Sequence, residues 1–225
     1  MKRSRLIFTM IGLIATAVVP IGGSQANGKL DEILANMQKA ASTITSIHAK
    51  MDQIKRDLQI GGIEKYSGQV FFKHAAKGND KVKIIYSKPP GQTIWVVGET
   101  ITLYQAEINQ AIITTRSAAA SKGDEFAFIA TPYSSVPELK RQYNIVYVGD
   151  DQSLAKLELT PKAKSSIQKL TLWVDQATWL PVRYTVLESN GNPTTFTLSD
   201  VKKNQGISDS TFKVDLPKGT KMLRR

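Results

Sequence analysis

The chain has 225 residues, a formal net charge of +11 at neutral pH and no cysteine. These values exclude a disulfide framework and a lipid-modified amino-terminal cysteine, so core packing alone must stabilise the fold. The positive charge favours an anionic partner, such as phospholipid headgroups or an acidic protein surface. Nucleic acid is not expected as a partner, because the sequence has no basic patch with interleaved aromatic residues.

The first 26 residues have the pattern of a secretory signal peptide. Basic residues at positions 2, 3 and 5 precede an uncharged apolar run over residues 6–19, and a small-x-small cleavage site ends at Ala26. The apolar run is shorter than the roughly 20 residues that span a membrane, although an uncleaved anchor is the alternative. We expect export to the periplasm and a single domain over residues 27–225 that is soluble, monomeric and not an integral membrane protein.

Residues 30–44 carry apolar side chains at helical spacing. Asn27 is a candidate N-cap for this segment. The spacing predicts an amphipathic helix of about four turns that packs on a sheet and, in a more specific hypothesis, also gates a cavity. The apolar positions are Leu30, Ile33, Leu34, Met37, Ala41 and Ile44.

Short segments with β-type alternation occupy residues 47–115 and, after a break, residues 143–214, where the predicted strands include residues 180–188 and 212–214. Glycine, proline and asparagine separate them at intervals typical of an antiparallel meander rather than of βαβ units. About eleven strands are predicted, more than a flat open sheet holds without curling. The fold class is therefore α+β, with a strongly curved antiparallel sheet.

The break between the two β regions is predicted to cover one face of the sheet. Residues 117–123 read as a linker of small residues, residues 124–130 as a short helical turn, and residues 136–142 as a helix in which Pro137 suits the amino terminus. Short helices inserted into a β domain are best explained as a cover over its apolar face.

Catalytic and metal-binding patterns are not found in the sequence. His48 and His74 are the two histidines, and neither lies in a cluster with metal-ligand spacing. No serine lies in a Gly-x-Ser-x-Gly motif. The sequence therefore predicts a protein that is not an enzyme and that has no cofactor and no metal.

Five local patterns follow one another along the chain. They are Gly68–Lys73, Val82–Pro89, Gly98–Tyr104, Leu157–Lys162 and Leu216–Thr220, the last preceded by Phe212. Their order and spacing over nearly all of residues 27–225 resemble the periplasmic outer-membrane lipoprotein carrier family, LolA.

The resemblance implies an incompletely closed antiparallel β-barrel whose concave face is lidded by helices over an apolar cavity. It implies a carrier that moves the acyl chains of lipoproteins from the inner to the outer membrane. Each methylene taken from a membrane costs about 0.8 kcal/mol, so we expect an ATP-driven releasing complex in the inner membrane and an acceptor at the outer membrane. A lipid-sensing or hydrophobic-ligand-binding regulatory module is the alternative, and a lyase or isomerase is a third hypothesis.

Alternation along the strands, together with the resemblance, predicts the residues of the cavity and its lid. The acyl cavity is assigned to Phe72, Ile84, Tyr86, Ile94, Val96, Leu103, Leu157, Leu159, Leu172, Val174, Phe196 and Leu198. Leu34, Met37, Phe126 and Phe128 are assigned to the lid. The family commonly has an arginine that latches the lid, and His74 or Lys73 takes this place here.

Overall fold

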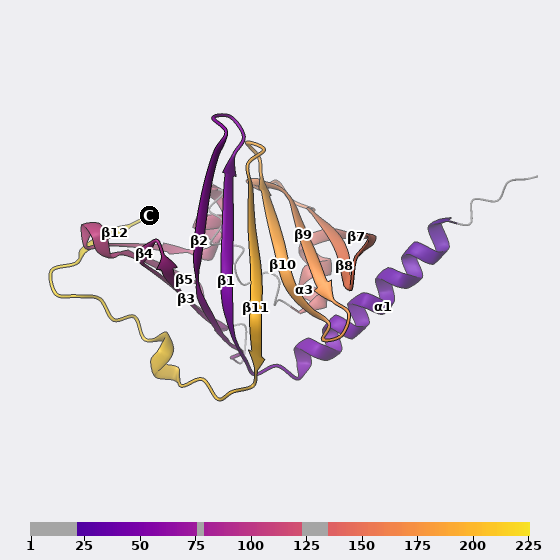
Figure 1. Ribbon diagram of the computed structural model, residues 1–225, viewed down its shortest axis with the longest axis horizontal. Helices are drawn as coiled ribbons and strands as arrows, with labels where there is room; N and C mark the ends of the chain where they lie inside the picture. The colour runs from indigo at the N-terminus through magenta and orange to yellow at the C-terminus, as the bar shows by residue number, and fades with distance from the viewer. Residues whose placement is uncertain (1–21, 76–78, 123–134) are drawn as a thin grey trace, which may run out of the picture.

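A computed structural model of the protein describes residues 22–75, 79–122 and 135–225. These residues form one large curved sheet with three helices (Figure 1). The helices are α1 (Gly22–Ser42), α2 (Arg116–Lys122) and α3 (Val136–Gln142), and the short 3₁₀ segments are η2 (Ala106–Ile108) and η5 (Asp209–Phe212). The strands are β1 (Ser46–Asp57), β2 (Gly62–Lys73), β3 (Lys81–Lys88), β4 (Pro90–Val97), β5 (Thr100–Gln105), β6 (Gln110–Thr115), β7 (Tyr143–Asp151), β8 (Leu154–Pro161), β9 (Ile167–Asp175), β10 (Leu180–Glu188), β11 (Pro193–Lys203) and β12 (Lys221–Arg224).

The sheet has 12 strands in the order β12-β6-β5-β4-β3-β2-β1-β11-β10-β9-β8-β7. Neighbouring strands are antiparallel except β12, which runs parallel to β6. Because β12 and β7 form the two ends of this order, the sheet curves without closing. The predicted curved, incompletely closed antiparallel architecture is confirmed, with 12 strands in place of about eleven.

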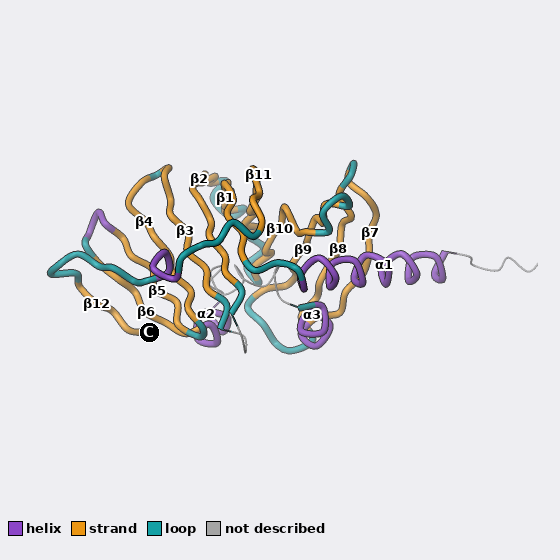
Figure 2. Tube along the Cα trace, turned by 90° about the horizontal axis from the view of Figure 1, so that it is seen from below, coloured by secondary structure: helices purple, strands orange, loops and turns teal. Residues whose placement is uncertain are grey.

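The inner, concave face of the arch holds the hydrophobic core. Alternate residues of each strand point inward, as in β2, where Val70 and Phe72 are buried between exposed Gln69 and half-buried Phe71 and Lys73. Viewed from below, the strands form an arch with α2 and α3 on its inner side (Figure 2). Helix α1 contacts β7, β10 and α3, so it covers the inner face of the carboxy-terminal half of the sheet.

The helices differ from the sequence-based prediction in two places. Helix α1 begins at Gly22, so Asn27 lies inside the helix and is not its N-cap. The predicted linker over residues 117–123 is instead mostly helix α2, since alanine favours helix and the Thr115 hydroxyl accepts a hydrogen bond of 3.1 Å from the Ala118 N–H. The predicted helix over residues 136–142 is confirmed, whereas the turn over residues 124–130 lies outside the described residues.

The end of the chain crosses the outer, convex face. A strand was predicted at residues 212–214, but Phe212 ends the 3₁₀ segment η5 and is buried, and the last strand is β12. Asp209 accepts hydrogen bonds of 2.9 Å from the ammonium groups of both Lys73 and Lys81. These two bonds, led by the one from Lys73, hold the pKa of the Asp209 carboxyl below its usual range. The tail is therefore fastened to β2 and β3 by charge as well as by Phe212.

Replacing Asp209 with asparagine is expected to loosen this tail. Amide hydrogen exchange over residues 207–225 should quicken about two- to fivefold at neutral pH, because a surface ion pair of this kind contributes modestly. The contribution of a carboxylate with a lowered pKa is present above its ordinary pKa and is lost as pH falls through the lowered value. The difference between D209N and the original protein should therefore vanish in acid.

The control is Asp215→Asn, because Asp215 lies on the same tail and makes no ion pair within the described residues. Equal exchange in both variants would mean that the Asp209 bonds do not hold the tail.

Candidate functional site

An apolar hollow lies on the concave face where the two halves of the sheet curve toward each other. It is narrow: about 290 Å³ of atom-free space includes the open solvent at its mouth, and only about 10 Å³ can hold the centre of a water-sized sphere. Its walls come from β1, β2 and β3 on one side and from β10 and β11 on the other. The lining residues are Met51, Val70, Phe72, Val82, Ile84, Tyr184 and Leu198.

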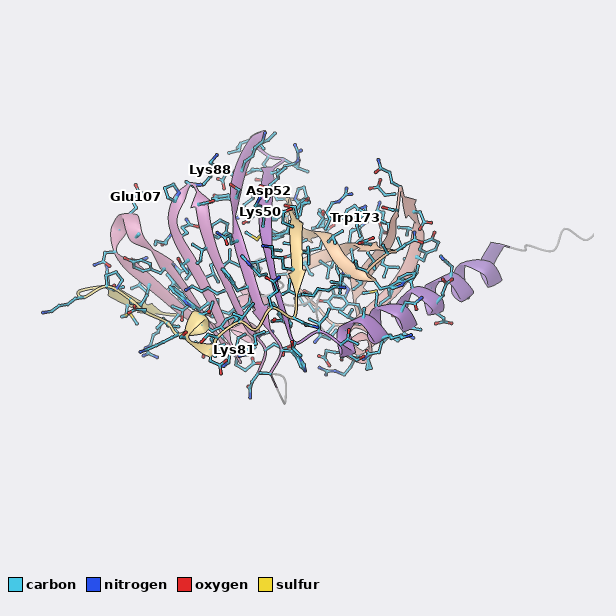
Figure 3. All side chains as sticks on the ribbon, turned by 60° about the horizontal axis from the view of Figure 1, so that its bottom comes forward. Lys50, Asp52, Lys81, Lys88, Glu107 and Trp173 are labelled. Atoms are coloured by element: carbon cyan, nitrogen blue, oxygen red, sulfur yellow. The ribbon has the colours of Figure 1, made fainter. Side chains whose placement is uncertain are left out.

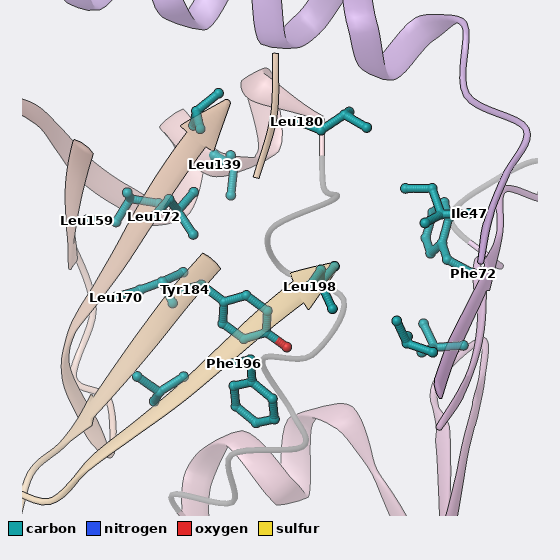
Figure 4. Close-up of a cluster of buried hydrophobic side chains, with 14 of the residues drawn as sticks. Ile47, Phe72, Leu139, Leu159, Leu170, Leu172, Leu180, Tyr184, Phe196 and Leu198 are labelled. Atoms are coloured by element: carbon teal, nitrogen blue, oxygen red, sulfur yellow. The ribbon is translucent and has the colours of Figure 1, made fainter. Parts of the chain in front are cut away.

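Strand register explains why these side chains gather. Phe72 pairs with Val82 and Val70 with Ile84 across β2 and β3, while Met51 of β1 pairs with Leu198 of β11. Directly paired residues point to the same face of a sheet, so each pair adds two apolar groups to the same wall. The close-up shows Phe72 and Ile47 on one side, facing Leu198, Tyr184 and Phe196 on the other (Figure 4).

Three of the residues predicted for the cavity line the hollow, namely Phe72, Ile84 and Leu198. The others belong to the surrounding apolar interior, where all are buried except half-buried Leu103. They are Tyr86, Ile94, Val96, Leu103, Leu157, Leu159, Leu172, Val174 and Phe196. Their assignment to an acyl cavity stays a prediction, since they lie around the hollow rather than at its surface.

Four lining residues were missed by the sequence analysis. Val70 and Val82 lie two positions before Phe72 and Ile84, so strand alternation could have found them. Met51 likewise lies two positions after buried Ala49 on β1, so both side chains point to the same face. Tyr184 had no such signal, because its place depends on which strands meet across the curve.

Polar atoms in this interior are few and mostly satisfied. The Tyr86 hydroxyl donates a hydrogen bond of 2.5 Å to the side-chain carbonyl of Gln53, and both residues are buried. Tyr184 stacks on Phe196 with ring centroids 4.7 Å apart. In the ranges that the structure describes, no group of three or more His, Cys, Asp or Glu side chains could hold a metal ion. The arrangement can bind apolar groups and offers no acid–base pair for chemistry.

The predicted lid residues of α1 lie on its buried face. Leu34 and Met37 are buried in the same core cluster as the walls of the hollow. The Gln38 side chain accepts a hydrogen bond of 3.0 Å from the Val136 N–H, which ties α1 to α3. Phe126 and Phe128, the other two lid candidates, lie outside the described residues. A movement of α1 would therefore involve α3 as well.

The two latch candidates make contacts outside the hollow. The Lys73 ammonium donates hydrogen bonds of 2.9 Å to the Ile207 carbonyl and to Asp209 on the convex face. The exposed His74 ring lies 2.9 Å from the Asp80 carboxylate. The latch role of either residue stays a prediction.

Arg116 is a half-buried cation that sequence reasoning missed. Its Nε donates a hydrogen bond of 2.8 Å to the Gly98 carbonyl at the start of α2. Burial lowers the pKa of this guanidinium, and the charges of Glu99 and Asp80 raise it in part. Its Nη2 is buried without a hydrogen-bond partner among the described residues. No sequence pattern distinguished Arg116 from the other basic residues of the chain.

An open curved sheet with an apolar concave face under short helices defines a binding or carrier scaffold. The family described as "Outer membrane lipoprotein carrier protein LolA" matches residues 42–215. This chain belongs to the LolA family, whose members are periplasmic carriers and not enzymes. In the described part of the chain, no helix is long and apolar enough to cross a membrane.

One relative is similar to this chain in sequence, and two solved structures are similar to it in fold. The chain is 22% identical over 226 residues to an outer-membrane lipoprotein carrier protein of Cupriavidus pinatubonensis, covering 99% of this chain and 100% of the relative. An uncharacterized conserved protein of Thermus thermophilus has a similar fold, with a TM-score of 0.54 at 16% identity over 88% of this chain and 99% of that one. A putative outer membrane lipoprotein-sorting protein domain of Vibrio parahaemolyticus gives 0.50 at 14% identity, over 80% and 94%.

Proposed function

We propose that the protein is a periplasmic carrier that holds the acyl chains of lipoproteins on its concave face and moves them from the inner to the outer membrane. The observation that supports this best is the hollow lined by seven aliphatic, thioether and aromatic residues from five strands, in a chain of the LolA family. The amino-terminal signal pattern supports delivery of the protein to the periplasm.

The size of the hollow bears on how such cargo would enter. As it stands the hollow has room for about one water molecule, so even a single acyl chain would need it to widen. Helices α1 and α3 cover the adjoining core and are linked by the hydrogen bond to Gln38. We therefore infer that both helices move away from the sheet as a unit when cargo is loaded. Cargo would then favour the open state by binding it more tightly than the closed one.

Loading and unloading would depend on other components. Moving an acyl chain out of a bilayer costs about 0.8 kcal/mol of free energy per methylene. Burial of the chain in the hollow can offset at most a similar amount. We therefore infer that an energised complex at the inner membrane loads the carrier and that an acceptor at the outer membrane removes the cargo.

The direct test is native mass spectrometry of the protein isolated from the periplasm. We expect a bound triacylated peptide or lipoprotein. Free phospholipid or glycolipid in its place would contradict lipoprotein transport and would favour a lipid-binding regulatory module. Protein that remains empty when lipoproteins are abundant would also contradict the proposal.

Replacing Val82 with phenylalanine is expected to block the hollow. The larger side chain would fill the hollow beside Phe72, the cross-strand partner of Val82, at an overpacking cost of about 1–3 kcal/mol. Retention of acylated cargo or of a fluorescent fatty-acid probe should fall about tenfold or more. Val148→Phe is the matched control, because Val148 is exposed on β7, away from the hollow. Equal retention in the two variants would argue against this site.

A further inference from the structure

The β1–β2 hairpin ends in a cluster of exposed apolar side chains. Leu58, Ile60 and Ile63 are 64%, 83% and 54% exposed, and they are three of the largest exposures among the apolar residues described. The hairpin rises above the neighbouring strand ends in Figure 1, so its tip projects from the sheet. We call these three residues the apolar tip. Three branched side chains exposed within six positions have no role in the core or in the hollow.

The tip is held in one conformation by hydrogen bonds to its own turn and to the next hairpin. The Asp57 carboxylate accepts a hydrogen bond of 2.9 Å from the Gln59 N–H. The Leu58 N–H donates a bond of 2.9 Å to the side-chain carbonyl of Asn192, in the turn between β10 and β11. Gly61 adopts a φ of +71°, which suits a tight turn. The apolar side chains are therefore presented by a braced turn.

Basic side chains surround the base of the tip. Arg56 and Lys65 are exposed on the two strands just behind it, and Lys88 ends β3 at the same end of the sheet (Figure 3). The nearby acidic groups include three carboxylates: Asp57 accepts a hydrogen bond within the turn, Glu64 accepts one of 2.7 Å from the Tyr66 hydroxyl, and Glu188 of the adjoining hairpin accepts one of 3.0 Å from the Asn190 side-chain amide. Residues 27–225 add a formal net charge of +8, since residues 1–26 hold three of the 30 basic residues and none of the 19 acidic ones. Apolar residues with cations behind them match the boundary between acyl chains and anionic headgroups.

We propose that the apolar tip inserts into the headgroup–acyl boundary of an anionic phospholipid bilayer and docks the protein on the membrane surface. A stable protein interface buries about 800 Å² on each partner and needs a matching shape. A narrow projecting turn offers too little area for that, whereas a fluid bilayer accepts it without a preformed complement. Docking by this tip is independent of what the hollow carries.

The test measures binding of ligand-stripped protein to phosphatidylcholine–phosphatidylglycerol vesicles by flotation. The triple variant Leu58→Ser, Ile60→Ser, Ile63→Ser should lose at least about tenfold in affinity for the vesicles. The matched control Val146→Ser, Val148→Ser removes two exposed apolar side chains from β7 and should bind as the original does. Because all these positions are exposed, circular dichroism should show an unchanged fold for both.

A second variant tests the charges. Arg56→Glu with Lys65→Glu should weaken binding to the mixed vesicles and flatten its dependence on salt, because each lost cation removes an attraction to anionic lipid. Binding to pure phosphatidylcholine vesicles should change little.

A single cysteine reports insertion directly, since the chain has none of its own. Ile60→Cys labelled with an environment-sensitive dye should shift to the blue on the mixed vesicles, and the same dye at Val148→Cys should not. An original protein that does not bind these vesicles, a triple variant that binds undiminished, or a dye at position 60 that stays in water would each overturn the proposal. Retention of acylated cargo by the triple variant would be unaffected, so failure here is distinct from failure of the carrier function.

Discussion

Replacing Gly68 with alanine is expected to lower the free energy of unfolding by about 3 kcal/mol or more. A Cβ atom at this position would lie 2.2 Å from the Ile85 carbonyl oxygen and 3.0 Å from the Tyr86 Cα. Both atoms are backbone, so no side chain can turn away to make room. Strands β2 and β3 would have to separate where their register already shifts, between Ser67 and Gly68.

Urea denaturation measures this effect, with Gly62→Ala as the control on the same strand. A Cβ at Gly62 would meet its nearest atom, the Asp57 Cβ, at an ordinary 3.7 Å. That variant should change stability by less than about 1 kcal/mol. The melting temperature of G68A should fall by about 6–12 °C for a domain of this size. Similar stabilities for the two variants would mean that the sheet adapts and that Gly68 is not required.

The consequence of G68A should reach the hollow. Gly68 pairs with Met51 on one side and with Tyr86 on the other, and Met51 lines the hollow. A shift between β2 and β3 would move Val70 and Ile84 relative to each other as well. Any fraction of G68A that stays folded should therefore retain less apolar ligand than G62A does.

Much of the fold was predictable because its signals are local. The strand over residues 180–188 and the helix over residues 136–142 were predicted with the observed bounds, since alternation and Pro137 mark them in the chain itself. The end of the chain was not. Residues 212–214 are too few to show alternation, and distant contacts from Lys73 and Lys81 to Asp209 decide their conformation.

The candidate site was predictable only in part, for a similar reason. Alternation tells which face Phe72 and Leu198 occupy, but not that β1 brings their strands near each other. It also gives no sign that the carboxy-terminal half supplies Tyr184 to the same hollow. The curvature of the whole sheet divides inward-facing residues into those that line the hollow and those, such as Leu159, that are buried in the core around it.

Replacing Phe196 with alanine tests whether the core residues next to the hollow are separate from it, and it should have a large effect on stability. Phe196 is fully buried, and its ring stacks on Tyr184, which lines the hollow. Removing a buried phenyl group is expected to cost about 3–5 kcal/mol and to lower the melting temperature by about 6–20 °C. Phe71→Ala is the control, because Phe71 stacks on His48 on the convex face and is only half-buried. It should cost about 1 kcal/mol.

The space left by F196A should open toward the hollow through Tyr184. An apolar ligand could then occupy both spaces, and a ligand that binds the folded state stabilises it in proportion to the logarithm of its concentration over the dissociation constant. Saturating acyl ligand should therefore raise the melting temperature of F196A by more than it raises that of the original protein or of F71A. An equal rise in all three would place the ligand away from Tyr184, whereas a larger rise in F196A alone would place acyl chains on the concave face.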